Sequence, residues 1–321
     1  MSSPVAYTEI AAVPLKWVGP LPVWLSEGLE TLWVPLATYE SPLWPSTRRG
    51  ALVAGHSGGV RCTVLDDRMT RSILLEAAGA AAAQEVVRFA KEEMETLQTW
   101  TAATSRFARL IDVHAEIVGP LLFLRLAFQT GDASGHNMST KAAERILRGL
   151  VDKFPGVTEV SVSGNLCCDK KVSAVNGLLG RGKSVVAEAL IPERIVRRHL
   201  KTTAQAVADL NLRKNLLGSI LAGGVRSANA HVANLLLAFY LATGQDAANI
   251  VEGSQAIVHA EDRAGDLYFS LSLPNLIVGT VGNGKGLPFV EEALTRLGCR
   301  AERAPGENAR RLAQICAAAA W

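Results

Sequence analysis

Four polar clusters stand in otherwise apolar stretches of this 321-residue chain. Each mixes acids with basic or small polar residues, and they are Glu40 with Ser46 and Arg49, the run Asp169-Lys170-Lys171, Asp246 with Lys214, His231 and Asn234, and the run Gly131 to Met138. A glutamate, a lysine and an aspartate brought together could reduce a carbonyl group. The ammonium would stabilise the oxygen as it becomes an alkoxide, and a desolvated carboxylic acid can donate a proton near neutral pH. Taken singly, each cluster also has an ordinary explanation as a solvated group, an ion pair or a turn.

A fifth motif, GLLGRGKS at residues 177–184, matches the phosphate-loop pattern GxxxxGK[ST]. The chemistry of that loop needs an apolar strand before it and a helix after it, so that main-chain N–H groups converge on phosphate. Here the preceding segment is polar, and the following residues are β-branched with Pro192 close behind, which predicts a strand. We therefore interpret the motif as a structural turn and not as a nucleoside triphosphate site.

Composition excludes several classes of protein. The 33 lysines and arginines stand against 30 aspartates and glutamates without a basic tail, so we expect no nucleic-acid partner. Five cysteines without CxxC spacing predict a reducing interior and no metal site. The first residues lack the pattern of a signal peptide, and the longest apolar stretch, 232–243, is shorter than the roughly 20 residues that span a bilayer. These patterns predict a cytoplasmic protein without a membrane segment.

Length divided by about 150 residues per domain suggests two domains. Residues 1 to about 57 are rich in proline, glycine and tryptophan and predict a β-rich layer. Between 59 and 167 the periodicity predicts β-α-β-β-α-β, the split βαβ of ferredoxin-like folds, with a strand at 60–65 and a helix at 75–97. From 168 onward most of the chain is predicted to be helical, with a long helical region at 202–244 and strands at 184–191, 266–273 and 276–281. The predicted fold class is thus α+β: a large, mostly helical domain with a long central helix (1–58 and 168–321) and an inserted ferredoxin-like domain (59–167).

Seven ordered blocks carry a resemblance to a known family. They are TGDASGHNM, SGNLCCDKK, GRGKSVVAEALIP, LKTTAQAVADLNLRKNLLGS, NAHVANLLLAFYLATGQDAA, GDLYFSLSLPNLIVGTVG and PGENARRLAQI. From about Val13 to its end the chain resembles class I 3-hydroxy-3-methylglutaryl-CoA (HMG-CoA) reductases. The resemblance implies reduction of HMG-CoA to mevalonate and free CoA with two NADPH. It also implies a large substrate-binding domain, a small NADP(H)-binding domain, and a homodimer or dimer of dimers with the active site at the subunit interface.

The resemblance also assigns site residues. The catalytic residues that it implies are Glu40, Lys170 and Asp246. The substrate contacts that it implies are Ser46, Arg49, Arg71, Ser163, Lys171, Lys214, His231 and Asn234. The NADPH contacts that it implies are Ser105, Arg106, Phe107, Asp132, Ala133, Ser134, Gly135, His136, Asn137 and Met138, with Ser105 and Arg106 matching the site for the 2′-phosphate.

The sequence departs from the family pattern at three places. Tyr39 and Ser41 flank Glu40 where the family has TTEG, and His136 replaces the methionine that is usual in the cofactor loop. The family's histidine that protonates the CoA thiolate follows PGENAR, whereas the last histidine here is His259. We expect that histidine in a segment beyond Trp321; the alternative is a catalytically impaired relative that binds CoA thioesters.

Overall fold

The computed structural model describes residues 11–282 and 284–321, so the first ten residues of the predicted 1–58 segment lie outside the described residues. The strands are β1 (Leu15–Leu25), β2 (Gly28–Ala37), β3 (Val60–Glu76), β4 (Arg109–Val118), β5 (Leu121–Gln129), β6 (Thr158–Ser161), β7 (Gly182–Ile191), β8 (Ile257–Arg263) and β9 (Asp266–Leu276). The longer helices are α1 (Leu43–His56), α2 (Ala80–Glu92), α3 (Met94–Ala102), α4 (His136–Lys153), α9 (Val232–Ala242), α11 (Pro288–Arg296) and α12 (Glu307–Ala320).

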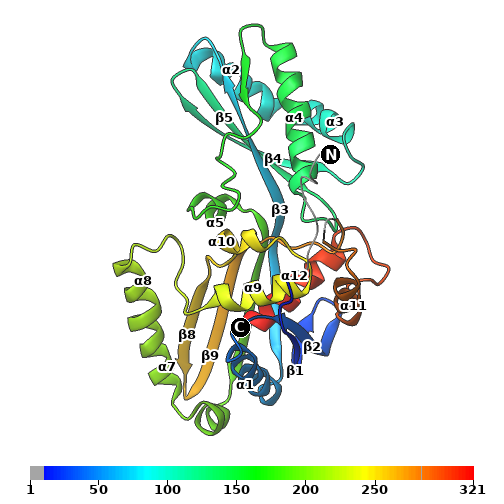
Figure 1. Ribbon diagram of the computed structural model, residues 1–321. Helices are drawn as coiled ribbons and strands as arrows, with labels where there is room; N and C mark the ends of the chain where they lie inside the picture. Colours follow the sequence, from blue (N-terminus) through cyan, green and yellow to red (C-terminus); the bar gives the residue numbers. More distant parts are fainter. Residues whose placement is uncertain (1–10, 283) are drawn as a thin grey trace, which may run out of the picture.

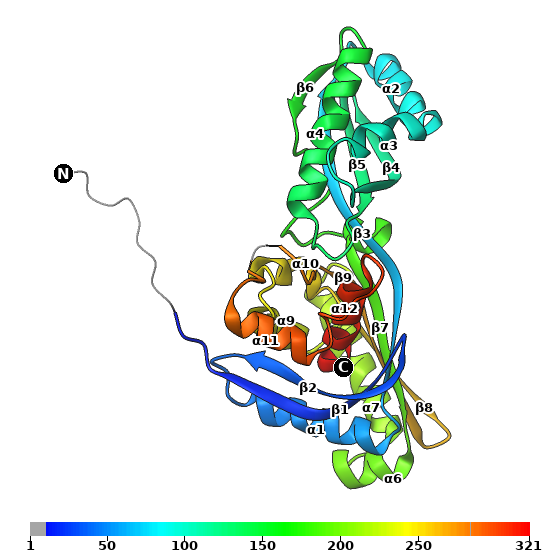
Figure 2. The ribbon, with the colours of Figure 1, turned by 90° about the vertical axis from the view of Figure 1, so that its right-hand side faces the viewer.

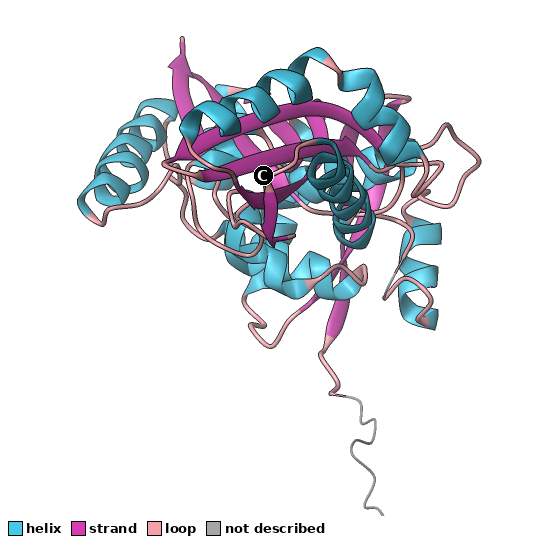
Figure 3. Ribbon diagram, turned by 90° about the horizontal axis from the view of Figure 1, so that it is seen from above, coloured by secondary structure: helices cyan, strands magenta, loops and turns pink. Residues whose placement is uncertain are grey.

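The other helical segments of the described residues are short. They are α5 (Val175–Leu179), α6 (Glu193–Ile195), α7 (Ala204–Leu210), α8 (Gly218–Leu221), α10 (Ile250–Gly253), the π-helical turns η1 (Val196–Leu200) and η2 (Asn211–Leu217), and the 3-10 turn η3 (Ala247–Asn249). The result is a mixed α/β fold, and from above helices lie around the strands (Figure 3).

Strand β3 belongs to both halves of the sheet (Figure 1). Its first part, to Arg68, pairs with β7, and from Met69 onward it pairs with β5, with β6 on its other side. The lower strand order is β2-β1-β3-β7-β9-β8, and the upper order is β4-β5-β3-β6. Among the nine strands of the described residues, β1 and β3 alone pair with each other in parallel, so the sheet is mixed. We call residues 69–161 the upper unit and the other described residues the lower unit (Figure 2).

The length of β3 differs from the sequence prediction of a strand ending at 65. The strand continues to Glu76, and a helix begins only at Ala80. Its middle is rich in charged and hydroxyl residues, which hid the strand pattern. Those side chains have partners across the strand: Asp67 pairs with Lys183 at 3.1 Å, and Thr70 accepts hydrogen bonds from Arg181. Buried polar groups are tolerated when they are paired in this way.

The upper unit has its own hydrophobic core. Helices α2, α3 and α4 pack on the sheet through fully buried side chains, among them Leu97, Leu124, Phe128 and Ile146. The chain order from β3 to β6 is strand, two helices, two strands, helix and strand.

The lower unit is built around α9 and α12, which pack against the six-stranded part of the sheet. The apolar stretch 232–243 of the predicted helical region forms the buried helix α9, in which Leu236, Phe239 and Tyr240 are fully buried. The prediction of one long central helix is wrong. Helix α8 ends at Leu221 and α9 begins at Val232, with Gly223 in the left-handed region at φ +71° between them. Glycine adopts that conformation at little cost, and it stops the helix.

Two further strand predictions need correction. Residues 276–281 do not form a strand of their own, since β9 runs through to Leu276. Strand β8 was not predicted, although its buried and exposed residues alternate along 257–261. Within the described residues, helices fall short of the length and apolar character that a bilayer crossing requires.

Gly149 lets α4 approach the ring of Trp100 on α3 closely, and a substitution at this glycine tests the contact. A Cβ at Gly149 would lie 2.6 Å from ring carbons of Trp100. We expect Gly149→Ala to lower the free energy of unfolding by about 1–3 kcal/mol through overpacking. Gly218→Ala is the matched control, because nothing lies within 4 Å of its Cβ position and alanine favours a helix by about 0.5–1 kcal/mol. Thermal unfolding measures both, and equal stabilisation by the two changes would contradict the packing described.

Candidate active site

A cavity of about 640 Å³ lies where the upper and lower units meet. Its walls include Arg71, Ser105, the run 133–138, Lys170 and Asp246. These residues come from β3, the turn after α3, the start of α4 and two loops of the lower unit. The structure therefore brings together two of the three predicted catalytic residues and most of the predicted cofactor loop.

Lys170 and Asp246 form an ion pair in this cavity, with 2.6 Å between Nζ and Oδ2. The other carboxylate oxygen of Asp246 accepts the N–H of Ala248 at 3.1 Å, which fixes the group at the start of η3. The hydrogen bond to Asp246 raises the pKa of Lys170. Burial alone would raise the pKa of Asp246, but the bonds from Lys170 and Ala248 lower it. The pair is thus charged at neutral pH, and Lys170 stays 39% exposed toward a ligand.

Asp169, the neighbour of Lys170, fixes the same loop through contacts with Arg181 and His136. Its Oδ1 accepts a hydrogen bond of 2.6 Å from Arg181, whose side chain is almost completely buried, and lies 3.5 Å from Nε2 of His136. Burial by itself would raise the pKa of Asp169, but His136 and Arg181 lower it far below the ordinary range. His136 is the first residue of α4, so this contact joins the run 131–138 to the loop of Lys170.

The run 131–138 is shaped by glycine. Gly135 has φ +94°, and a Cβ there would lie 2.6 Å from the side chain of Thr130. The chain thus turns sharply into α4, whose first-turn N–H groups have no side-chain cap. A helix N-terminus attracts anions through these N–H groups and the helix dipole.

The charges of the cavity also favour an anionic ligand. Asp169 and Asp246 are each paired with a basic residue. Arg71, Lys141 and Lys285 also line the cavity, and within the described ranges these three side chains make no ion pairs. Burial and the nearby Arg300 lower the pKa of Lys285 to about 8. The net positive lining suits a phosphate-bearing molecule.

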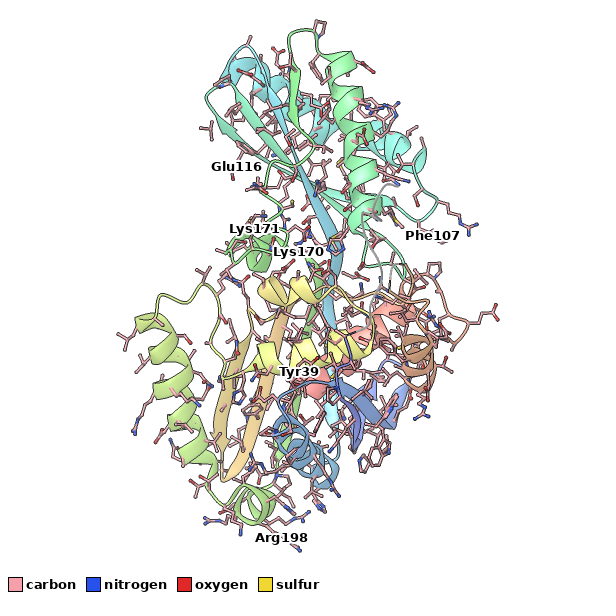
Figure 4. The ribbon with its side chains drawn as sticks, viewed as in Figure 1. Tyr39, Phe107, Glu116, Lys170, Lys171 and Arg198 are labelled. Atoms are coloured by element: carbon pink, nitrogen blue, oxygen red, sulfur yellow. The ribbon has the colours of Figure 1, made fainter. Side chains whose placement is uncertain are left out.

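Some predicted cofactor contacts lie elsewhere. The side chain of Asp132 accepts the N–H of Ala309 at 3.0 Å and so caps α12; it does not line the cavity. The guanidinium of Arg106 stacks over the ring of Phe107 at 4.6 Å; both residues are exposed and neither lines the cavity. Figure 4 shows Phe107 on the upper unit, near its junction with the lower unit.

The predicted catalytic residue Glu40 and several predicted substrate contacts are not brought to Lys170 within one chain. Glu40 lies in the exposed segment between β2 and α1, and Figure 4 shows its neighbour Tyr39 on the lower unit, away from Lys170 at the junction. Ser46 and His231 line a separate cavity of about 270 Å³. The others do not line the cavity of Lys170: Arg49, Lys214 and Asn234 are exposed on helical segments, Ser163 follows β6, and Lys171 donates to the carbonyl of Asp169.

Sequence reasoning missed Lys141, Arg181, Glu252 and Lys285. Arg181 and Lys183 belong to the motif that was interpreted as a structural turn. The structure agrees, since a turn at Gly180 and Arg181 joins α5 to β7, which begins within the motif, and Lys183 is buried against Asp67. Glu252 gave no sequence signal, because it contacts Lys170 across 82 positions of the chain. His, Cys, Asp and Glu side chains of the described residues form no cluster of three that could hold a metal ion.

Comparisons with known proteins give a consistent result. A family model described as hydroxymethylglutaryl-coenzyme A reductase matches residues 8–320. The chain is 44% identical to the 3-hydroxy-3-methylglutaryl-coenzyme A reductase of Pyrococcus abyssi over 313 residues, covering 97% of this chain and 76% of the relative. The corresponding protein of Aeropyrum pernix is 43% identical over 309 residues, covering 96% of this chain and 73% of the relative.

Among solved structures, the class II 3-hydroxy-3-methylglutaryl-CoA reductase from Streptococcus pneumoniae, bound to NADPH in open conformations, has a TM-score of 0.71 at 19% identity. The match covers 98% of this chain and 84% of that one. At this identity the likeness shows the fold alone.

The low pKa of Asp169 predicts how stability depends on pH. A carboxyl group whose pKa is lower in the folded than in the unfolded state stabilises above its unfolded value of about 3.9. That contribution is lost as the pH falls through the folded value. We expect Asp169→Asn to lower the free energy of unfolding by about 2 kcal/mol near pH 7, with a difference that shrinks below about pH 4. Urea denaturation at both pH values measures this, with Asp152→Asn, on the exposed end of α4, as the control. A difference independent of pH would contradict the ion pair.

Proposed function

Because this chain belongs to the hydroxymethylglutaryl-coenzyme A reductase family, we propose that it reduces HMG-CoA to mevalonate and free CoA with NADPH. The sequence resemblance to this family is confirmed. The observation that carries the assignment is the charged Lys170–Asp246 pair. It lines the same positively charged cavity as residues 133–138.

The cavity fits a dinucleotide phosphate. Its volume of about 640 Å³, the uncapped start of α4 and the cations Arg71, Lys141 and Lys285 together suit a polyanion. Residues 133–138 and Ser105 would hold the nucleotide there. Reduction of a thioester to an alcohol requires two hydrides, and each of two NADPH molecules bound in turn would supply one.

Lys170 supplies the electrostatic part of the reaction. Its ammonium donates a hydrogen bond to the thioester oxygen while that oxygen becomes an alkoxide, and a donor fixed in place before the reaction is worth more than a solvent molecule. Asp246 keeps the ammonium protonated and aimed, since it lies 2.6 Å away and is itself fixed by the N–H of Ala248. Glu40 is proposed as the acid that exchanges a proton with the alkoxide.

The domain roles remain proposals. We assign NADP(H) binding to the inserted segment 59–167 and substrate binding to 1–58 and 168–321. The antiparallel order β4-β5-β3-β6 and the separate core of the upper unit support a ferredoxin-like inserted domain. Strand β3 lies wholly within the proposed inserted segment, yet its first half pairs with β7 of the proposed substrate-binding domain.

We further propose a homodimer, or a dimer of dimers, whose active site lies at the interface. The support is that, within one chain, several of the predicted site residues lie away from Lys170. Glu40, Arg49, Lys214 and Asn234 are exposed polar groups, and they do not line the cavity of Lys170. A second copy would bring such groups to that cavity. The alternative of an impaired CoA-thioester-binding relative is not favoured, since the family match spans residues 8–320 and the Lys170–Asp246 pair is intact.

The proposed function is tested on the full-length protein by NADPH oxidation with HMG-CoA, with mevalonate identified by mass spectrometry. We expect two NADPH to be consumed for each mevalonate formed. Lys170→Met should lower kcat by about 10²- to 10³-fold, while NADPH binding, followed by nucleotide fluorescence, stays unchanged. Lys91→Met, exposed on α2, is the control. Full activity of Lys170→Met would overturn the role of Lys170, and no HMG-CoA-dependent oxidation by the unmodified protein would overturn the function.

A further inference from the structure

The main chain of Lys170 has an unfavourable conformation. Lys170 has φ +55°, and two other non-glycine residues of the same loop, Asn165 and Cys168, have φ values of +60° and +45°. For residues with a Cβ the left-handed region costs about 1–2 kcal/mol each. Such a conformation persists only when the surrounding structure holds it, so groups outside the loop must stabilise it.

Glu252 of α10 contacts this loop from another segment of the lower unit. Its Oε1 accepts the main-chain N–H of Lys170 at 3.1 Å and the side-chain amide of Asn249 at 2.9 Å. The side chain of Glu252 is completely buried. Because Asp246 binds the ammonium at 2.6 Å, the single segment 246–252 holds both the main chain and the side-chain end of Lys170.

Arg181 compensates the buried charge of Glu252. Its Nε lies 3.5 Å from Oε1 of Glu252, and it donates to Asp169 at 2.6 Å and to the carbonyl of Thr70 at 2.7 Å. A buried carboxylate without such a partner would cost several kcal/mol. Within the described residues Oε2 of Glu252 has no hydrogen-bond partner, so the carboxylate is oriented through Oε1, the oxygen that contacts the loop.

We propose that Glu252, supported by Arg181, is a positioning residue that fixes the left-handed main chain of Lys170 and thereby aims the ammonium into the cavity. This proposal rests on the proposed reductase function of the same site. It also explains the role of the GRGK turn at 180–183. In this proposal the turn does not bind phosphate; it places the buried Arg181 against the loop of Lys170.

Glu252 acts on Lys170 through its charge as well as through the hydrogen bond. The pKa of Lys170 is raised by Asp246 first, and also by Asp169 and Glu252. The other charged or titratable groups on the cavity walls are Arg71, His136, Lys141 and Lys285, and Arg181 lies behind the loop. Replacing Glu252 by a neutral residue therefore lowers the pKa of Lys170, and the alkaline limb of the activity profile moves to lower pH.

Two variants of the full-length protein separate the hydrogen bond from the charge. Glu252→Ala removes both. We expect the amide of Lys170 to exchange with deuterium about tenfold faster, and kcat to fall by about 10²-fold with little change in KM. Glu252→Gln keeps an oxygen acceptor, so amide protection and kcat near neutral pH should be largely rescued while the alkaline limb still moves to lower pH. If Glu252→Ala does not fold, the proposal is tested by the deuterium exchange of the Lys170 amide and by the pH profile of activity in Glu252→Gln.

Glu30→Ala is the matched control, because Glu30 pairs with Arg311 at 2.6 Å away from the cavity. It should lose stability without losing kcat of the folded protein. The proposal is overturned if Glu252→Ala leaves the Lys170 amide as protected as before, or if its kcat falls only in proportion to the folded fraction, as in Glu30→Ala. The exchange measurement needs no substrate, so it remains decisive even if the proposed function fails.

Discussion

The charge of Lys170 is held among three carboxylates that come from two segments of the chain. Asp246 binds the ammonium, Asp169 precedes it in sequence, and Glu252 accepts its main-chain N–H. Two of these acids share one buried guanidinium, that of Arg181. A cation in such surroundings stays protonated and keeps a fixed direction, which are the two properties that stabilisation of a developing alkoxide requires. The proposed chemistry depends on this arrangement.

The fold places this cation at the junction of the upper and lower units. Strand β3 runs through both units, and β6 pairs with its upper part. The loop that follows β6 therefore enters the lower unit close to β3. Asp132 adds a second link, since its carbonyl accepts the N–H of Thr280 and its carboxylate caps α12 at Ala309. The run 131–138 of the upper unit is thereby fixed against the lower unit, and the cavity between them has walls from both.

Much of this could be predicted from sequence because the signals were local. The second helix of the predicted β-α-β-β-α-β order is α4, and the apolar stretch 232–243 forms the buried α9. Lys170 and Asp246 were found together because the resemblance assigns them related roles, and the structure pairs them. The rest depended on contacts between distant positions. The polar middle of β3 did not read as a strand, since its partners Arg181 and Lys183 lie more than a hundred residues away, and Glu252 resembled any other helical acid.

The most direct measurement is a crystal structure of the full-length protein with HMG-CoA bound. The account predicts that the thioester oxygen lies within hydrogen-bond distance of Nζ of Lys170, about 2.7–3.2 Å, while Asp246 still contacts the same ammonium. A thioester bound away from Lys170 in every copy, with the ammonium turned to solvent, would contradict it.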